Sequence, residues 1–92
     1  MSDQPSSNDP IDVRTVLAVS MDQFAALAWQ RMGMQSDTFT GKIHKDIAQA
    51  KLAIEACSRL SELIEAELDE SDRRQVQNLI RDLKVNFVEQ SK

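Results

Sequence analysis

The sequence predicts an all-α protein built from three helices. Apolar residues recur at steps of three and four over long segments. No segment shows the sustained alternation of apolar and polar residues that predicts a half-buried strand. Asn-Gly and Asp-Gly turns are absent, and the 92 residues include only two glycines and two prolines. This length suits one domain, which we place at residues 9–92 after a disordered tail at residues 1–8.

The first helix is predicted to run from Asp9 to Gly33. Asp9 can cap the free N–H groups, and Pro10 suits the first helical position because it has no N–H of its own. Asp12 places a carboxylate near the positive end of the helix dipole. Gly33 is a natural stop signal. The expected helix is therefore about 24 residues long.

A loop at residues 35–42 separates the first helix from the second. Its Ser, Asp, Thr and Gly content is typical of a loop, and Phe39 is expected to be its one apolar anchor. The second helix is predicted from about Ile43 or Asp46 to Ala66. Its apolar positions follow steps of three and four or their sums, and they are Ile47, Ala50, Ile54, Cys57, Ile64 and Leu68.

The third helix is predicted to begin at Asp69 and to continue to about Glu89. Asp69 can cap the free N–H groups, and Asp72 completes a pair that resembles a capping box. One narrow apolar stripe contains Val76, Leu79, Ile80, Leu83 and Phe87. The second and third helices are expected to form an antiparallel hairpin, with the long first helix packed across it.

The first helix carries more apolar surface than one side of a core needs. The Phe24 seam contains Val13, Val16, Leu17, Ser20, Phe24 and Leu27. The Trp29 seam lies beside it and contains Ala18, Met21, Ala25, Trp29 and Met32. Together the two seams cover more than half of the helix circumference, which is wider than the ~100° stripe of a helix that lies on one face of a core.

We interpret the Trp29 seam as the candidate partner face, and purely internal core is the alternative. Exposure of its larger side chains would forfeit ~1.5–3 kcal/mol each, a serious loss for a small domain. The second helix also has spare apolar positions at Leu52, Ala56 and Leu63. We therefore expect a non-catalytic protein–protein interaction or oligomerisation module. A two-fold homodimer is the default, and docking of a partner protein's helix is the variant.

Three segments resemble the family of short bacterial proteins known as domain of unknown function 1844. The family shows an A-K-x-x-I-D-x-x-x-x-L helix, a leucine followed by a threonine cap with acidic residues, and a closing L-R-x-x-Y-V. The corresponding residues here are Ala50, Lys51, Ile54, Glu55 and Leu60, then Leu68, Asp69 and Asp72, then Leu83, Lys84, Phe87 and Val88. The first helix, ending in Met32-Gly33, is similar to the family's Leu-Gly ending.

The chain departs from that family at residues 63–67, where LIEAE replaces the usual Lys-Thr-Lys-Gly-Asn turn. We therefore expect either a tighter turn or a longer second helix. The resemblance implies a family without a characterised function, so it transfers no functional residues to this chain.

No catalytic, metal or cofactor site is predicted. Cys57 lies on the apolar stripe of the second helix, which favours a buried core residue over a reactive thiol. His44 has no nucleophile and orienting acid placed near it, so a surface histidine is the expected role. Six acids lie between Glu62 and Asp72. They are interpreted as solvated helix ends, because a calcium loop would need a central glycine.

A basic row on the third helix provides the alternative function, a nucleic-acid-associated regulator. Its members are Arg74, Gln77, Arg81 and Lys84. The competing interpretation is that the row faces Glu55 and Glu62 of the second helix, or water. The formal net charge of -4 disfavours nucleic acid and anionic lipid as partners. Without a secretory signal or a membrane-spanning segment, the chain is expected to be cytoplasmic, with no small-molecule substrate.

Overall fold

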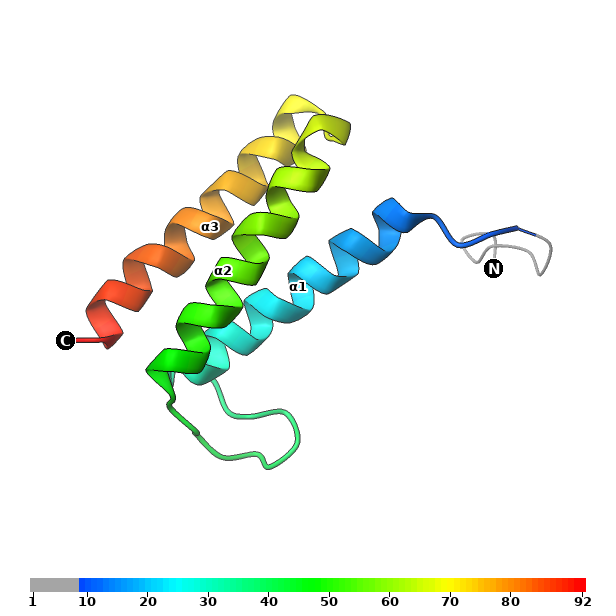
Figure 1. The fold of residues 1–92 in the computed structure, drawn as a ribbon. Coiled ribbons are helices and arrows are strands. Elements are labelled where there is room, and N and C mark those ends of the chain that lie inside the picture. Colours follow the sequence, from blue (N-terminus) through cyan, green and yellow to red (C-terminus); the bar gives the residue numbers. More distant parts are fainter. Residues whose placement is uncertain (1–8) are drawn as a thin grey trace.

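The computed structural model describes residues 9–92, and in this part of the chain it contains helices only (Figure 1). Three α-helices and one short 3-10 helix follow one another as α1 (Val13–Arg31), α2 (Ile47–Ile64), η1 (Glu65–Glu67) and α3 (Glu70–Gln90). The all-α, three-helix prediction is confirmed for these residues. The predicted disordered tail at residues 1–8 lies outside the described residues.

Each α-helix begins after an aspartate whose side chain accepts a backbone N–H of the first turn. The bonds run from Arg14 N to Asp12 Oδ1 at 2.9 Å, from Gln49 N to Asp46 Oδ1 at 3.1 Å, and from Asp72 N to Asp69 Oδ1 at 2.8 Å. The predicted cap at Asp69 is confirmed, and Asp46, one of the two starts expected for the second helix, caps α2. The first helix starts later than predicted from Asp9, because Asp12 occupies the cap position.

Gly33 ends α1 as predicted. Its φ is +84°, in the left-handed region that favours glycine. The N–H of Met34 donates to the carbonyl of Trp29 at 3.1 Å, and the N–H of Gly33 donates to that of Gln30 at 3.0 Å. These two bonds form a Schellman motif, which satisfies carbonyls left free at the helix end.

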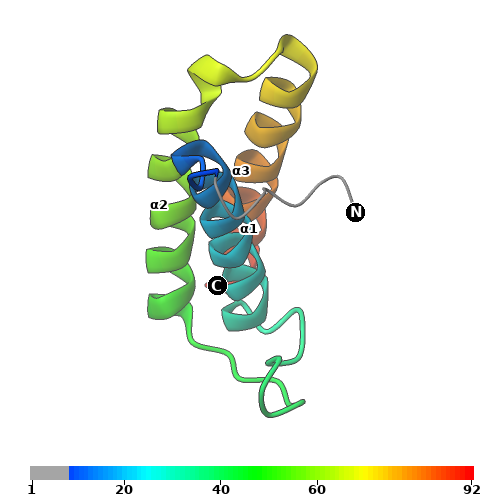
Figure 2. The ribbon, with the colours of Figure 1, turned by 90° about the vertical axis from the view of Figure 1, so that its right-hand side faces the viewer.

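α2 and α3 form an antiparallel hairpin, and α1 lies on one side of it (Figure 2). α1 packs mainly against α2 and contacts α3 far less. It crosses α2 obliquely, and its N-terminal half extends beyond the hairpin (Figure 1). The predicted packing of the first helix across both helices is therefore confirmed only in part.

At residues 63–67, where a tighter turn or a longer second helix was expected, the chain is helical throughout, as the end of α2 and then as η1. α2 ends at Ile64, and the chain turns through η1. The guanidinium of Arg73 holds this turn by donating to the carbonyls of Glu65 at 3.2 Å and Leu68 at 2.9 Å. A side chain from the first turn of α3 thus bonds to two carbonyls of the turn.

The core lies where α1 meets α2 and α3, and small side chains are prominent in it. Its buried apolar residues are Met21, Ala25, Ala28, Met32, Ala50, Ala53, Ile54, Cys57, Ile64, Ile80 and Leu83. Alanines on both α1 and α2 let the two helices approach closely, because the distance between packed helices depends on the size of the side chains at the contact. Trp29 is partly buried and packs against this cluster.

The structure corrects the assignment of the partner face. Met21, Ala25 and Met32 of the Trp29 seam are buried inside the protomer, and Ala18 is half-buried. The seam is thus internal core, which was the alternative interpretation. The reason is its small residues, since Ala25 and the neighbouring Ala28 allow the close contact with α2 that the bulkier Phe24 seam does not.

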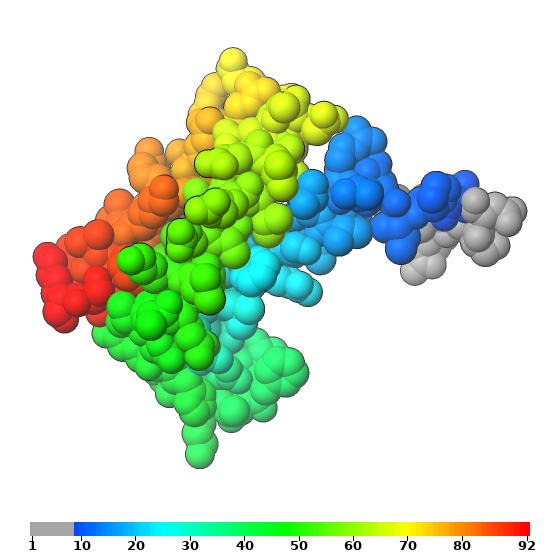
Figure 3. Space-filling view, viewed as in Figure 1, coloured from blue at the N-terminus to red at the C-terminus, as the bar shows by residue number. Residues whose placement is uncertain are grey.

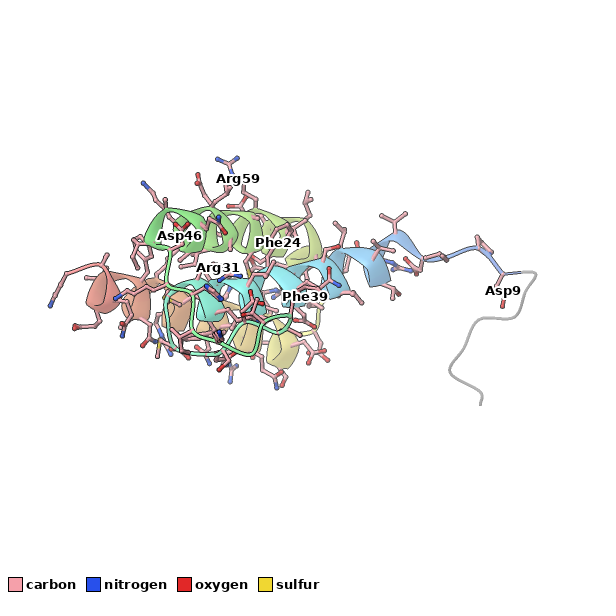
Figure 4. All side chains as sticks on the ribbon, turned by 90° about the horizontal axis from the view of Figure 1, so that it is seen from below. Asp9, Phe24, Arg31, Phe39, Asp46 and Arg59 are labelled. Carbon is pink, nitrogen blue, oxygen red and sulfur yellow. The ribbon has the colours of Figure 1, made fainter. Side chains whose placement is uncertain are left out.

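The loop between α1 and α2 is anchored by an ion pair and not by Phe39. The guanidinium of Arg31 pairs with the carboxylate of Asp37, whose side chain is only 9% exposed. Asp37 Oδ1 also accepts the backbone N–H groups of Phe39 at 2.8 Å and Thr40 at 3.0 Å. The side chain of Phe39 is 96% exposed, so its predicted role as an apolar anchor is wrong (Figure 4).

These contacts lower the pKa of the Asp37 carboxyl group to about 2, first through the Thr40 N–H, then through Arg31 and the Phe39 N–H. Each donor stabilises the charged form of the carboxylate. Because the folded pKa lies below the unfolded value of about 3.9, the stabilisation is complete above that value. It is lost as the pH falls through the folded pKa.

Truncation of Met32 tests the position of the core. Met32 is fully buried, and we expect Met32→Ala to lower the free energy of unfolding by about 2–5 kcal/mol through lost contacts and the cavity left behind. The matched control is Met34→Ala, which removes the same atoms from a side chain that is 44% exposed. It should change the free energy by less than about 0.5 kcal/mol. Urea unfolding followed by circular dichroism measures both, and equal losses would contradict this core.

Replacement of Asp37 by Asn tests the loop anchor. We expect Asp37→Asn to destabilise the protein at neutral pH and to flatten the fall in stability between pH 4 and pH 2, because the titrating group is gone. The free energy of unfolding in urea, measured from pH 2 to pH 7, gives both effects. Glu62→Gln removes an exposed carboxylate of α2 and serves as the control. An unchanged acid profile for Asp37→Asn would show that the ion pair does not hold the loop.

Candidate interaction surface

Most of the Phe24 seam faces solvent, although its Leu17 packs against the core. Val16 is 50% exposed, Leu27 is 40% exposed, and Phe24 is 37% exposed. Among the described residues, more large aliphatic and aromatic side chains are exposed than buried. Contiguous exposed apolar patches on small proteins commonly mark contact surfaces.

α2 extends this apolar surface. Leu52 and Leu63 are 68% and 64% exposed. Next to α1, a groove of about 320 Å³ is lined by Phe24, Leu27, Arg31, Gln49, Leu52 and Ala53. Phe24 lies on α1 near its boundary with α2 (Figure 4), and the two helices form one continuous surface in the space-filling view (Figure 3). We define the α1–α2 face as Val16, Phe24, Leu27, Leu52 and Leu63.

α1 has few charged residues, as is typical of a helix at the centre of a bundle, but it lies at the side of the α2–α3 hairpin (Figure 2). Between its ends at Arg14 and Arg31, Asp22 is its only charged residue. Arg14 pairs with Glu67 of η1 at 3.1 Å, and Arg31 is held by the loop. A helix whose apolar residues cover more than half of its circumference normally buries more than one side. Here only one side of α1 is covered.

The basic row of α3 is interleaved with carboxylates of the same helix. Arg74 bonds to Glu70 at 2.9 Å, and Arg81 lies 3.9 Å from Asp82. These carboxylates were not the partners expected from the sequence, which were Glu55 and Glu62 of α2. All of these charges are exposed, so each pair contributes little to stability.

The two remaining members of the row lie close to α2 and its continuation η1. The side-chain amide of Gln77 donates to Glu65 at 2.9 Å. Lys84 lines a groove of about 330 Å³ between α2 and α3, together with Lys51, Ile54, Glu55, Ser58, Phe87 and Val88. The row therefore does not form a strip of cations alone.

The polar residues singled out for chemistry lie apart. Cys57 is buried, and burial raises the pKa of its thiol to about 11, with a smaller contribution from Asp22. Its predicted role in the core is confirmed. His44 is exposed and bonds to Thr40 Oγ1 at 2.9 Å. Within residues 9–92, no group of three His, Cys, Asp or Glu side chains is placed to hold a metal ion.

The sequence contained one signal that could have identified the exposed seam. Both seams of α1 fit a helical period, but alanines alternate with larger residues in the Trp29 seam. A seam with regularly spaced small residues favours the closest helix contact, which here is the contact with α2. The Phe24 seam, with Phe24, Leu27 and Val16, could then have been assigned to the outside.

The membrane-spanning potential of the helices and three comparisons with known proteins bear on identity. None of the helices in residues 9–92 has the length and hydropathy that crossing a membrane requires. The comparison with curated proteins and the comparison with solved structures each found no match. A family model described as a domain of unknown function (DUF1844) matches residues 12–89. This match runs from the cap of α1 to the last turn of α3, and the chain therefore belongs to the DUF1844 family.

Proposed function

We propose that this protein is a non-catalytic helical module that works by protein–protein contact, and that its contact surface is the α1–α2 face. The observation that supports the proposal is the exposed apolar side of α1, continuous across a groove with Leu52 of α2. A cytoplasmic location and the lack of a cofactor stay predictions.

Burial of the α1–α2 face would supply the driving force. A large apolar side chain gains about 1.5–3 kcal/mol when it passes from full exposure to full burial. Leu52 and Leu63 are already partly covered, so each retains roughly two thirds of that gain, and Phe24 and Leu27 retain less. Only part of the gain becomes affinity, because association costs translational and rotational freedom.

The partner that fits best is a second copy of the chain. A two-fold axis through the face would bring the same side chains together from both copies, which is the commonest symmetric solution. α1 would then be covered by α2 of its own chain on one side and by the partner copy on the other. This arrangement gives α1 the central position that its almost uncharged sequence fits.

Charge insertion into the face tests the proposal. At high salt, which screens contacts between exposed charges, we expect wild-type protein to reach twice the 10.4 kDa protomer mass in light scattering over a dilution series. Leu52→Glu should weaken this association by roughly tenfold or more, because a buried carboxylate would replace an apolar contact. Its helix content should not change, since Leu52 is 68% exposed in the protomer.

The matched control is Val85→Glu, which adds the same charge at a position of α3 that is 57% exposed and lines none of the grooves described above. It should leave the association unchanged. A wild-type protein that stays monomeric at every concentration would refute the proposal, and so would equal effects of the two substitutions. Retained mass in Leu52→Glu would place the contact elsewhere.

A further inference from the structure

The loop between α1 and α2 is ordered, yet it presents an aromatic side chain to solvent. Phe39 is 96% exposed, while its backbone N–H is fixed by the carboxylate of Asp37. Two backbone hydrogen bonds also close the loop. The N–H of Asp37 donates to the carbonyl of Lys42 at 2.8 Å, and the N–H of Gly41 donates to the carbonyl of Asp37 at 2.8 Å. A side chain held out on a fixed backbone loses little conformational freedom when a partner binds it.

The residues that follow Phe39 in the loop are mostly apolar or basic. Ile43 is 55% exposed, and Lys42, His44 and Lys45 follow in the same loop. The carboxylate of Asp37 is neutralised by its ion pair. The only other acid of the loop region is the cap of α2, whose side chain accepts a backbone N–H. The surface that complements this loop is therefore apolar and acidic.

A groove of that character lies on the same molecule, near the turn between α2 and α3. It has a volume of about 320 Å³. Its apolar lining includes Met21 of α1, Ile64 at the end of α2, Leu68 after η1 and Leu79 of α3. Asp22 and Asp72 also line it, and they supply the negative charge. Its volume is at the lower end of the range for small-molecule sites, which suits a single side chain.

The loop and the groove cannot meet within one chain. The loop projects from the end of the bundle where α1 meets α2, whereas the turn through η1 lies at the opposite end (Figure 1). An α2 of 18 residues separates the two ends by about 27 Å. Contact between them requires two molecules.

We propose that Phe39 of one copy inserts into the Asp22–Asp72 groove of a second copy, with Lys42 and Lys45 beside the two carboxylates. This contact joins different surfaces of the two copies, so it is head-to-tail and builds rings or open chains. It uses none of the residues of the α1–α2 face. The protein thereby has a second mode of association, which can link dimers into larger assemblies.

An anionic membrane is the other surface that an aromatic and basic loop could meet. The net charge of -4 repels the protein from anionic lipid, and it repels a second copy as well. The second copy differs in presenting a groove of about 320 Å³ that combines apolar side chains with Asp22 and Asp72, and so matches both the ring and the lysines of the loop. Self-association is therefore the better match.

Sedimentation velocity over a concentration series, at low and at high salt, tests the proposal with the full chain. We expect species above the dimer that decrease as salt screens the charges. Phe39→Ser should remove them, with a roughly thirtyfold loss of affinity typical of a central aromatic contact. It should not alter helix content, given the exposure of Phe39. Val85→Ser, a truncation at an exposed site on α3, is the control and should retain them.

A charge exchange identifies the two surfaces. One variant carries Lys42→Glu with Lys45→Glu, and the other carries Asp22→Lys with Asp72→Lys. Each alone should assemble less than wild type, and an equal mixture should recover assembly, because each loop then finds a groove of opposite charge. Leu52→Glu should weaken the two-fold contact but leave the salt-sensitive head-to-tail contact unchanged. This difference distinguishes the head-to-tail contact from the two-fold dimer.

Three results would overturn the proposal. The first is an absence of species larger than a dimer in the wild type. The second is assembly that Phe39→Ser leaves unchanged. The third is binding to vesicles of anionic phospholipid that requires Phe39, in the absence of self-association, which would assign the loop to a membrane.

Discussion

The close contact between α1 and α2 determines most other features of the molecule. Ala28 and Ala50 are completely buried, and Ala25 and Ala53 are nearly so. Four small side chains in one core let the two helices approach, and the approach selects which side of α1 faces inward. With the Trp29 seam inside, the equally apolar Phe24 seam is left outside. The same packing that forms the core thus creates the exposed face.

Local signals in the sequence were sufficient for the helices and for one of the three caps. Asp69 could be recognised as a cap because the bond that it makes reaches only three residues along the chain. The start of α1 was less certain, since Asp9 and Asp12 both qualify. Arg14 favours the later cap by bonding both to Asp12 and to Glu67, which is 53 residues away. That distant contact has no local signature.

Which apolar residues are exposed was harder to predict, because exposure also depends on contacts between residues that are distant in the sequence. Both seams of α1 are apolar and follow a helical period, so this pattern does not decide which seam α2 covers; the volume of the side chains does. Phe39 was expected inside because it is the one apolar residue of its loop. Instead, the carboxylate of Asp37 lies in the interior of the loop, where it pairs with Arg31. It also accepts the backbone N–H of Phe39, and the Phe39 ring lies outside.

The two ends of the bundle carry charges of opposite sign, which the net charge alone does not reveal. The formal value of -4 describes a mildly acidic protein. Yet the cations Lys42 and Lys45 lie in the loop at one end, and the acids of residues 62–72 lie at the other, beside an apolar groove. Two copies arranged head to tail place unlike ends together, whereas the two-fold contact through the α1–α2 face is made of apolar side chains. Salt should therefore weaken the first contact and have little effect on the second, because screening acts on exposed charges and not on apolar burial.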